Sequence, residues 1–310
     1  MIFECKLIRF FTCFGSVTLV NVFLPKLLFK KYKLQKYSMV NEASKVELPP
    51  DLLKCNNSLD EKKILKKKYA KELLEISNKM LEILPDNSLF LKSINDVKIK
   101  KFKYKQVNQD SIVIKSGNHS TRKNIIRVES PTDLPHELFH LASSYFDFTK
   151  NILYSGFSQV NMKTRTIIGK GLTEGSTALL ENRYFKAEDS GYVLEKHFAN
   201  ILEIIVGEEK MFKFYCQADL QGLIVELSKY DKPENVIKFI NNFEFIDLNR
   251  MVKLDKDLIE KQLQSLVKFL TECYLKKTMN NLVNVPFEFT IPPMMNFFQK
   301  IGSGFSIKDK

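Results

Sequence analysis

Two histidines and one glutamate stand at a spacing that can hold a metal ion. His136 and His140 are four residues apart, and Glu137 directly follows the first of them. In an α-helix, side chains at positions i and i+4 lie on one face, so both imidazoles can reach the same ion. In this H-E-x-x-H spacing the glutamate reaches a water on the metal without itself binding the metal. These residues therefore predict a zinc-type centre.

A zinc ion held by two histidines needs a third protein ligand, with water in the fourth position. In one known arrangement, a glycine and a further histidine follow the motif at three and six residues. Ser143 and Phe146 stand at those positions, which excludes that arrangement. His119 and His197 are candidate ligands, although no helical spacing presents either of them. Glu174, near the start of a predicted helix, is the third candidate.

Two segments together resemble the motifs of the gluzincin metallopeptidases. They are His-Glu-Leu-Phe-His at 136–140 and Gly-Leu-Thr-Glu-Gly at 171–175, and the likeness covers about residues 125–190. The chain is similar in particular to small uncharacterised bacterial members. The resemblance implies an α+β, zincin-like fold. Such a fold has a small mixed sheet, a helix with the first motif, a helix with the ligand glutamate, and then a mostly helical C-terminal domain.

The resemblance also implies the roles of the site residues. It implies one Zn²⁺ per chain, with His136, His140 and Glu174 as its ligands. Zinc lowers the pKa of its water from about 15.7 to about 7 and polarises the peptide carbonyl. Glu137 would act as the general base that takes the proton and then delivers it to the leaving amine. The expected function is zinc-dependent hydrolysis of peptide bonds in a peptide or protein substrate.

The sequence leaves two supporting roles unassigned: the residue that orients a histidine and the residue that donates to the oxyanion. Thermolysin-like gluzincins place an aspartate four residues after the ligand glutamate to orient a histidine, whereas this chain has Ala178 there. Thr177 or Glu181 is the expected substitute. The oxyanion formed during hydrolysis also needs a hydrogen-bond donor. The candidates are Tyr154, Tyr192 and His197, of which we favour Tyr192 as a catalytic residue.

Apolar periodicity and capping residues place these motifs in a series of short elements. In chain order we expect a helix from residue 58 or 60 to 84, strands at 97–104, 112–114 and 125–128, a helix at 134–146, paired extended segments at 152–160 and 164–169, and a helix at 172–185. Beyond Gly191 the pattern is helical almost to the end, with breaks near Asp219, Pro233 and Pro286.

The chain divides into four predicted regions, and its 310 residues fit one large domain or two. We expect an N-terminal hydrophobic anchor or signal-like segment at 1–38 and a linker with a helix at 39–95. The zincin-like catalytic domain is expected at 96–190, and the helical C-terminal domain at 191–310.

The first 38 residues indicate membrane association. Residues 10–25 contain no charged residue, and the first 38 residues carry seven Lys or Arg and one Glu. About 20 mainly apolar residues can span a bilayer, and no small-residue cleavage pattern follows them. We therefore favour an uncleaved anchor over a secretory signal, with the side of the membrane left open. The alternative is a cytoplasmic protein whose true start is Met39.

Charge and composition narrow the function classes. The net charge is +12, and the first 38 residues supply +6 of it, seven minus one. The Lys runs at 62–68 and 98–105 are typical of solvated faces, so no nucleic-acid partner is predicted. The five cysteines are scattered, which argues against a disulfide scaffold or a cysteine-bound zinc. The main alternative to an enzyme is a catalytically inactive, membrane-associated binding module with a zincin fold. A basic nucleic-acid-binding protein is the third hypothesis.

Overall fold

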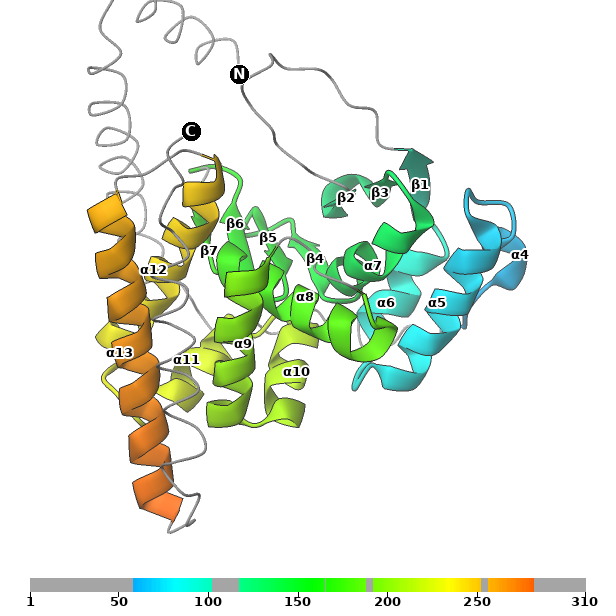
Figure 1. Ribbon diagram of the computed structural model, residues 1–310. Helices are drawn as coiled ribbons and strands as arrows, with labels where there is room; N and C mark the ends of the chain where they lie inside the picture. The colour runs from blue at the N-terminus through cyan, green and yellow to red at the C-terminus, as the bar shows by residue number, and fades with distance from the viewer. Residues whose placement is uncertain (1–57, 102–116, 165, 188–191, 252–255, 282–310) are drawn as a thin grey trace, which may run out of the picture.

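The computed structural model describes residues 58–101, 117–164, 166–187, 192–251 and 256–281. The fold is α+β, with two small sheets among many helices (Figure 1). One apolar cluster extends through it from Ile64 to Cys273. The division of the chain into four regions stays a prediction.

Three helices precede the first sheet: α4 (Glu61–Ile64), α5 (Ala70–Ile83) and α6 (Ser88–Ile94). The prediction of one continuous helix up to residue 84 is wrong, because the chain turns between α4 and α5, with Tyr69 at a positive φ of 57°. The ammonium of Lys67 donates hydrogen bonds from this turn to the carbonyls of Asn95 and Val97, at 3.0 and 2.7 Å. This tertiary contact explains the break in the helix. The spacing of the apolar residues alone cannot predict such a contact.

The first sheet has the order β1-β3-β2, with β1 (Lys98–Lys101), β2 (Gly117–Ser120) and β3 (Ile125–Val128). β1 runs parallel and β2 antiparallel to the central β3, so the sheet is mixed. Ile126 and Val128 are fully buried and lie opposite His119 and Gly117. Directly opposite residues share one face of a sheet. The predicted strand at 125–128 is confirmed, and residues 102–104 and 112–114 lie outside the described residues.

The motif helix, α7 (Leu134–Ala142), follows a 3-10 turn at Pro131–Asp133. The prediction that this helix extends to residue 146 is wrong, because the next residues form strand β4 (Ser144–Asp147). The hydroxyl of Ser143 donates to the carbonyl of Phe139 at 3.0 Å, which satisfies a carbonyl at the end of the helix. The residues after Ser143 therefore leave the helix and form β4.

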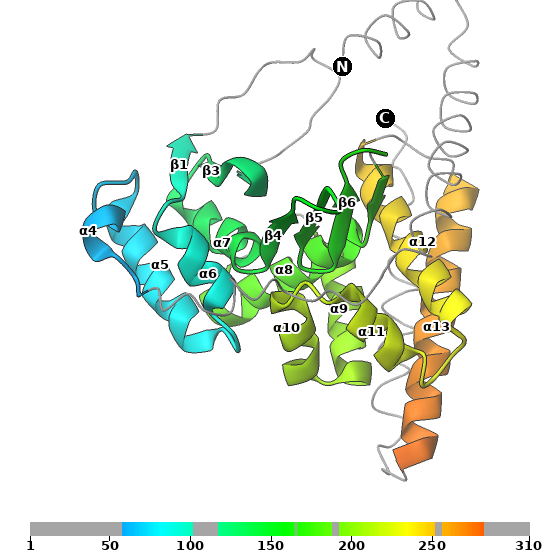
Figure 2. The same cartoon turned by 180° about the vertical axis from the view of Figure 1, so that it is seen from behind.

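The second sheet is antiparallel, with the order β4-β5-β6-β7. Its further strands are β5 (Ile152–Ser155), β6 (Ser158–Asn161) and β7 (Thr166–Ile168). The extended segment predicted at 152–160 is thus two strands. Gly156, with a positive φ of 54°, turns the chain between them. In both ribbon views the sheet lies between α7 and α12 (Pro233–Met251) (Figure 1, Figure 2).

Helices form the rest of the described chain: α8 (Lys170–Phe185), α9 (Val193–Val206), α10 (Glu208–Cys216), α11 (Leu220–Leu227), α12 and α13 (Lys256–Asn281). The predicted helix at 172–185 is confirmed as α8. The predicted breaks near Asp219 and Pro233 are confirmed too, since Asp219 caps α11 and α12 begins at Pro233. Pro286 lies outside the described residues. α8 packs against α7, α9 and α12, which places it at the centre of the fold.

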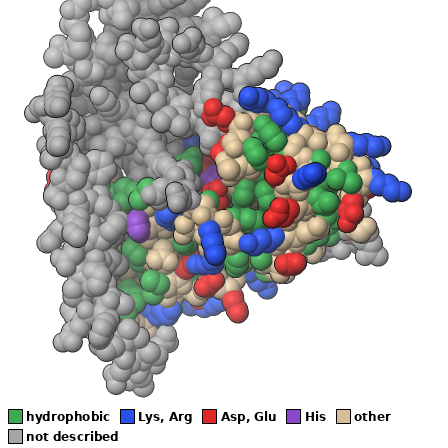
Figure 3. All heavy atoms as spheres, turned by 45° about the vertical axis from the view of Figure 1, so that its right-hand side comes forward, with side chains coloured by type: hydrophobic (Ala, Val, Ile, Leu, Met, Phe, Trp, Pro, Cys, Tyr) green, Lys and Arg blue, Asp and Glu red, His purple; other side chains and the backbone are tan. Residues whose placement is uncertain are grey.

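Lysines gather on one side of the molecule, on α4, in the turn that follows it and on β1 (Figure 3). The exposed members are Lys62, Lys63, Lys66, Lys68, Lys98, Lys100 and Lys101. Within the described residues the two Lys runs are therefore solvated as predicted, apart from the partly buried Lys67. No helix in the described part of the chain is both long and apolar enough to cross a bilayer. The anchor predicted at 1–38 lies outside that part.

α8 approaches α9 closely at Gly175, and this contact yields a prediction. A Cβ atom there would collide with the backbone carbonyl of Glu195. We expect Gly175→Ala to lower the free energy of unfolding by up to about 2 kcal/mol, because an overpacking cost of about 1–3 kcal/mol exceeds the gain of about 1 kcal/mol in helix propensity. Urea unfolding measures the change. Val225→Ala, at a residue 57% exposed on α11, is the control, and a Gly175→Ala protein of unchanged stability would contradict the packing.

Candidate metal centre

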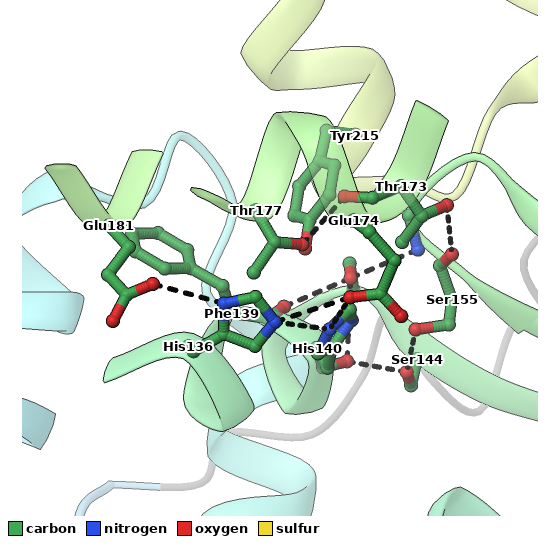
Figure 4. A network of polar contacts seen from close by, with 12 residues as sticks. His136, Phe139, His140, Ser144, Ser155, Thr173, Glu174, Thr177, Glu181 and Tyr215 are labelled. Carbon is green, nitrogen blue, oxygen red and sulfur yellow. Dashed lines mark hydrogen bonds and ion pairs between the residues drawn. The ribbon is translucent and has the colours of Figure 1, made fainter. Parts of the chain in front are cut away.

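Three predicted ligands meet between α7 and α8. His136 and His140 project from α7 and Glu174 projects from the first turns of α8 (Figure 4). The two histidine Nε2 atoms are 3.2 Å apart, and Glu174 Oε2 lies 3.3 Å from His136 Nε2 and 3.4 Å from His140 Nε2. The side chains are only 12–14% exposed. These three residues form a group that could hold a metal ion.

The spacing of the three atoms fits tetrahedral zinc. With zinc–ligand bonds of about 2.0–2.1 Å, neighbouring donor atoms of a tetrahedron lie about 3.3 Å apart. The observed sides of the triangle, 3.2, 3.3 and 3.4 Å, match that edge. Two imidazoles and one carboxylate are also the donor types of catalytic zinc sites, which leave the fourth position open.

Hydrogen bonds cannot form along all three sides of this triangle at once. Each of the three atoms lies within hydrogen-bond distance of the other two, but a protonated Nε2 carries a single hydrogen. His136 can therefore donate from Nε2 to Glu174 or to His140, and one contact is always left without a hydrogen. A cation at the centre of the triangle would satisfy all three atoms together.

A second carboxylate contacts His136, the first candidate ligand. Glu181 lies two turns after Glu174 on α8, and its Oε2 is 3.0 Å from His136 Nδ1. Its side chain is 6% exposed. A carboxylate on the outer nitrogen keeps the hydrogen there and leaves Nε2 for a metal. Of the two residues named as substitutes for the missing aspartate, Glu181 contacts the histidine. Thr177 instead bonds Tyr215 OH at 2.7 Å.

The carboxylates set the protonation of the centre in the metal-free chain. Burial by itself lowers the pKa of His136, but the hydrogen bonds to Glu174 and Glu181 outweigh it and raise this pKa to about 10. For Glu174, burial favours the protonated form, but His140 and His136 dominate and hold its pKa well below the usual value. His136 and Glu174 thus form a buried ion pair.

Glu137 lies beside the ligands but does not belong to the ligand triangle. Its residue is 4% exposed, and Oε2 is a buried atom without a hydrogen-bond partner among the described residues. Burial raises its pKa to about 7, although His140 and His136 pull in the opposite direction. A Cβ atom at Gly117 would collide with its carboxylate, so β2 approaches α7 closely here. The carboxylate is thus held next to the centre and changes charge near neutral pH.

A network of hydroxyl groups supports the ligand positions from the side of the second sheet (Figure 4). The Ser144 hydroxyl is within hydrogen-bond distance of the His140 carbonyl and lies 2.7 Å from the Ser155 hydroxyl. Thr173, next to Glu174, donates to the carbonyls of Ser155 at 3.2 Å and Gly169 at 2.9 Å. β4, β5 and the start of α8 are thereby fastened to the end of α7.

The remaining candidate residues differ in where they lie relative to the centre. Tyr192 lies at the start of α9 with its ring stacked on His136, at 5.8 Å and an interplanar angle of 12°. Tyr154 is 3% exposed and stacks on Tyr145 in a separate apolar cluster, so it does not face the centre. His119, on β2, and His197, on α9, are outside the ligand group. Burial, with a smaller contribution from His140, lowers the pKa of His119 to about 3.

Sequence reasoning missed three residues that shape the centre: Gly117, Ser144 and Tyr215. Gly117 precedes an asparagine and resembles a turn residue, whereas it is a strand residue against which Glu137 packs. Ser144 falls within the helix predicted at 134–146 but lies on β4. Tyr215 stands on α10, and only the tertiary fold brings it to Thr177. None of the three carries a local signal of its role.

Comparisons of the chain with models of known protein families, with curated proteins and with solved structures gave no significant match.

The Glu181–His136 contact predicts an effect on metal affinity. We expect Glu181→Ala to weaken zinc binding about 10- to 100-fold, because the loss of an outer-nitrogen partner has this typical cost. Glu181→Gln should weaken binding less, since its amide oxygen still accepts from Nδ1. Competition with a chromophoric chelator measures the affinity. Glu208→Gln, at a side chain 57% exposed, is the control, and equal affinity in all variants would contradict the role.

The histidine environments predict two unusual titrations in the metal-free protein. A free imidazole titrates near pH 6.5. His136 should keep its proton up to about pH 9, because its pKa is raised to about 10, and His119 should stay neutral down to about pH 4, because its pKa is lowered to about 3. Nuclear magnetic resonance of ¹³C-labelled histidines tests both, with assignment through His119→Gln and His136→Gln. Midpoints near 6.5 for both would refute the described contacts.

Proposed function

We propose that the chain is a zinc-dependent metallopeptidase of the gluzincin type. The observation that carries this proposal is the triangle of His136, His140 and Glu174 at tetrahedral spacing, with the buried Glu137 carboxylate beside it. A zinc ion bound by these ligands would supply Lewis-acid activation of a water and of the substrate carbonyl. A zincin-like arrangement of the fold belongs to the same proposal.

Glu137 is the proposed general base. A general base has to lie within reach of the proton that it takes, and the buried Glu137 directly follows His136 on α7. Its orphaned Oε2 is available to accept a proton and to return it to the leaving amine. Glu181 would hold His136 in the tautomer that binds metal, and Tyr192, stacked on the same ring, is the proposed donor to the oxyanion.

The edge of the first sheet offers a place for an extended peptide. In the order β1-β3-β2, β2 lies at the edge, and it pairs with β3 within the described part of the chain. Its Gly117 lies against Glu137, so a peptide added as a further strand would pass close to the metal centre. Strand addition supplies main-chain hydrogen bonds that do not depend on the substrate sequence.

The decisive variant is Glu137→Gln. It should bind zinc as the wild type does, because Glu137 is not in the ligand triangle, and it should hydrolyse peptides about 100- to 10,000-fold more slowly, since a general base contributes this much. Glu174→Ala should lose both zinc and activity. Zinc per chain by elemental analysis and peptide cleavage by mass spectrometry are measured on each protein. Full activity in a zinc-loaded Glu137→Gln protein would exclude the proposed mechanism.

A further inference from the structure

A row of four apolar side chains crosses the second sheet. The register pairs Phe146 of β4 with Leu153 of β5, Leu153 with Val160 of β6, and Val160 with Ile167 of β7. Directly opposite residues project from the same face of a sheet, so these four form one continuous stripe across all four strands. With strands about 4.8 Å apart, the stripe is about 14 Å long.

The stripe is accessible, whereas the opposite face of the sheet is buried. All four of its residues are half-buried. On the other face, Tyr145, Ile152, Tyr154 and Ile168 are at most 8% exposed, and three of them form an apolar cluster with Leu89 and Ala218. The core is thus made by the other face, and the stripe is not needed to fill it.

One end of this face leads to the metal centre. Ser144 and Phe146 are two residues apart on β4, and Ser155 and Leu153 are two residues apart on β5, so each pair projects from the same face. Ser144 contacts the His140 carbonyl and the Ser155 hydroxyl, and both serines lie beside His140 and Glu174 (Figure 4). The stripe is therefore the next row of side chains beyond the serines that border the centre.

The apolar surface continues away from the centre. Phe148, which follows β4, is 81% exposed and packs edge-to-face on Phe146 at 4.8 Å. Met162, which follows β6, is 41% exposed. Since β4 and β6 run in the same direction, both residues lie at the end of the sheet opposite to Ser144. Exposed apolar residues gathered in this way commonly mark a binding surface.

We propose that this stripe binds large apolar side chains of the peptide substrate on one side of the scissile bond. The inference rests on the proposed function, because it takes the metal centre as the place where the peptide bond is cut. A substrate extended from the centre over Ser144 and Ser155 meets apolar surface at the next row. The substrate class is therefore a peptide with Leu, Ile, Val or Phe close to the cleaved bond.

Cleavage of a diverse peptide mixture by the zinc-loaded protein, mapped by mass spectrometry, gives the preferred sites. We expect apolar residues on one side of the cut, and a value of kcat/KM at least about tenfold higher than for the same peptide with Asn in that place. Leu153→Asn should bring this ratio close to one. Val160→Thr, which keeps the shape and the strand preference of valine, is the second variant and should lower it. Val225→Asn on α11 is the control, and its ratio should equal that of the wild type.

The two proposals fail in different ways. An unchanged ratio in both folded stripe variants overturns the inference and leaves the peptidase standing. If the zinc-loaded wild type cuts no peptide, the proposed function fails, and the stripe is judged by fluorescence anisotropy with a labelled peptide that contains two leucines. Binding that Leu153→Asn weakens about tenfold would then support the stripe as a binding surface, and equal binding would overturn it.

Discussion

The meeting of two imidazoles and two carboxylates between α7 and α8 is the contact on which the rest of the structure depends. His136 and His140 face Glu174 and Glu181 with side chains at most 14% exposed. Charged groups taken out of water cost several kcal/mol each unless partners compensate them. The two helices therefore have to hold these groups within hydrogen-bond distance, and a divalent cation would compensate the carboxylates without a proton on Nε2.

Small residues make this close contact possible. Gly117 lets β2 approach the Glu137 carboxylate, and Gly175 lets α9 approach α8 at the turn that carries Glu174. Ser144 and Ser155 are short enough to bond the end of α7 to the second sheet. β2, α9 and the second sheet thus each come close to the residues of the centre. Each of them approaches the centre at a residue that has no side chain or a short one. On the second sheet, the larger apolar residues lie in the next row of side chains beyond the serines.

The residues differ in how far the sequence predicts them. The pair His136 and His140 depends only on the helical period, and the sequence predicts it directly. Glu174 lies on another helix, so it needed a resemblance, and Glu181 could be named only as one of two possibilities. The α+β class and α8 were predicted correctly. The strand at Ser144–Asp147 was not, because its apolar residues extend the helical pattern and only pairing with β5 distinguishes the two.

Both ring nitrogens of His136 lie against carboxylates of one helix, α8. Glu181 holds Nδ1 and Glu174 holds Nε2, so a rotation of the ring would break at least one of these contacts. The ring orientation is thus fixed by the packing of α7 on α8. A cation that bound at Nε2 would therefore meet an imidazole whose orientation the two helices already hold.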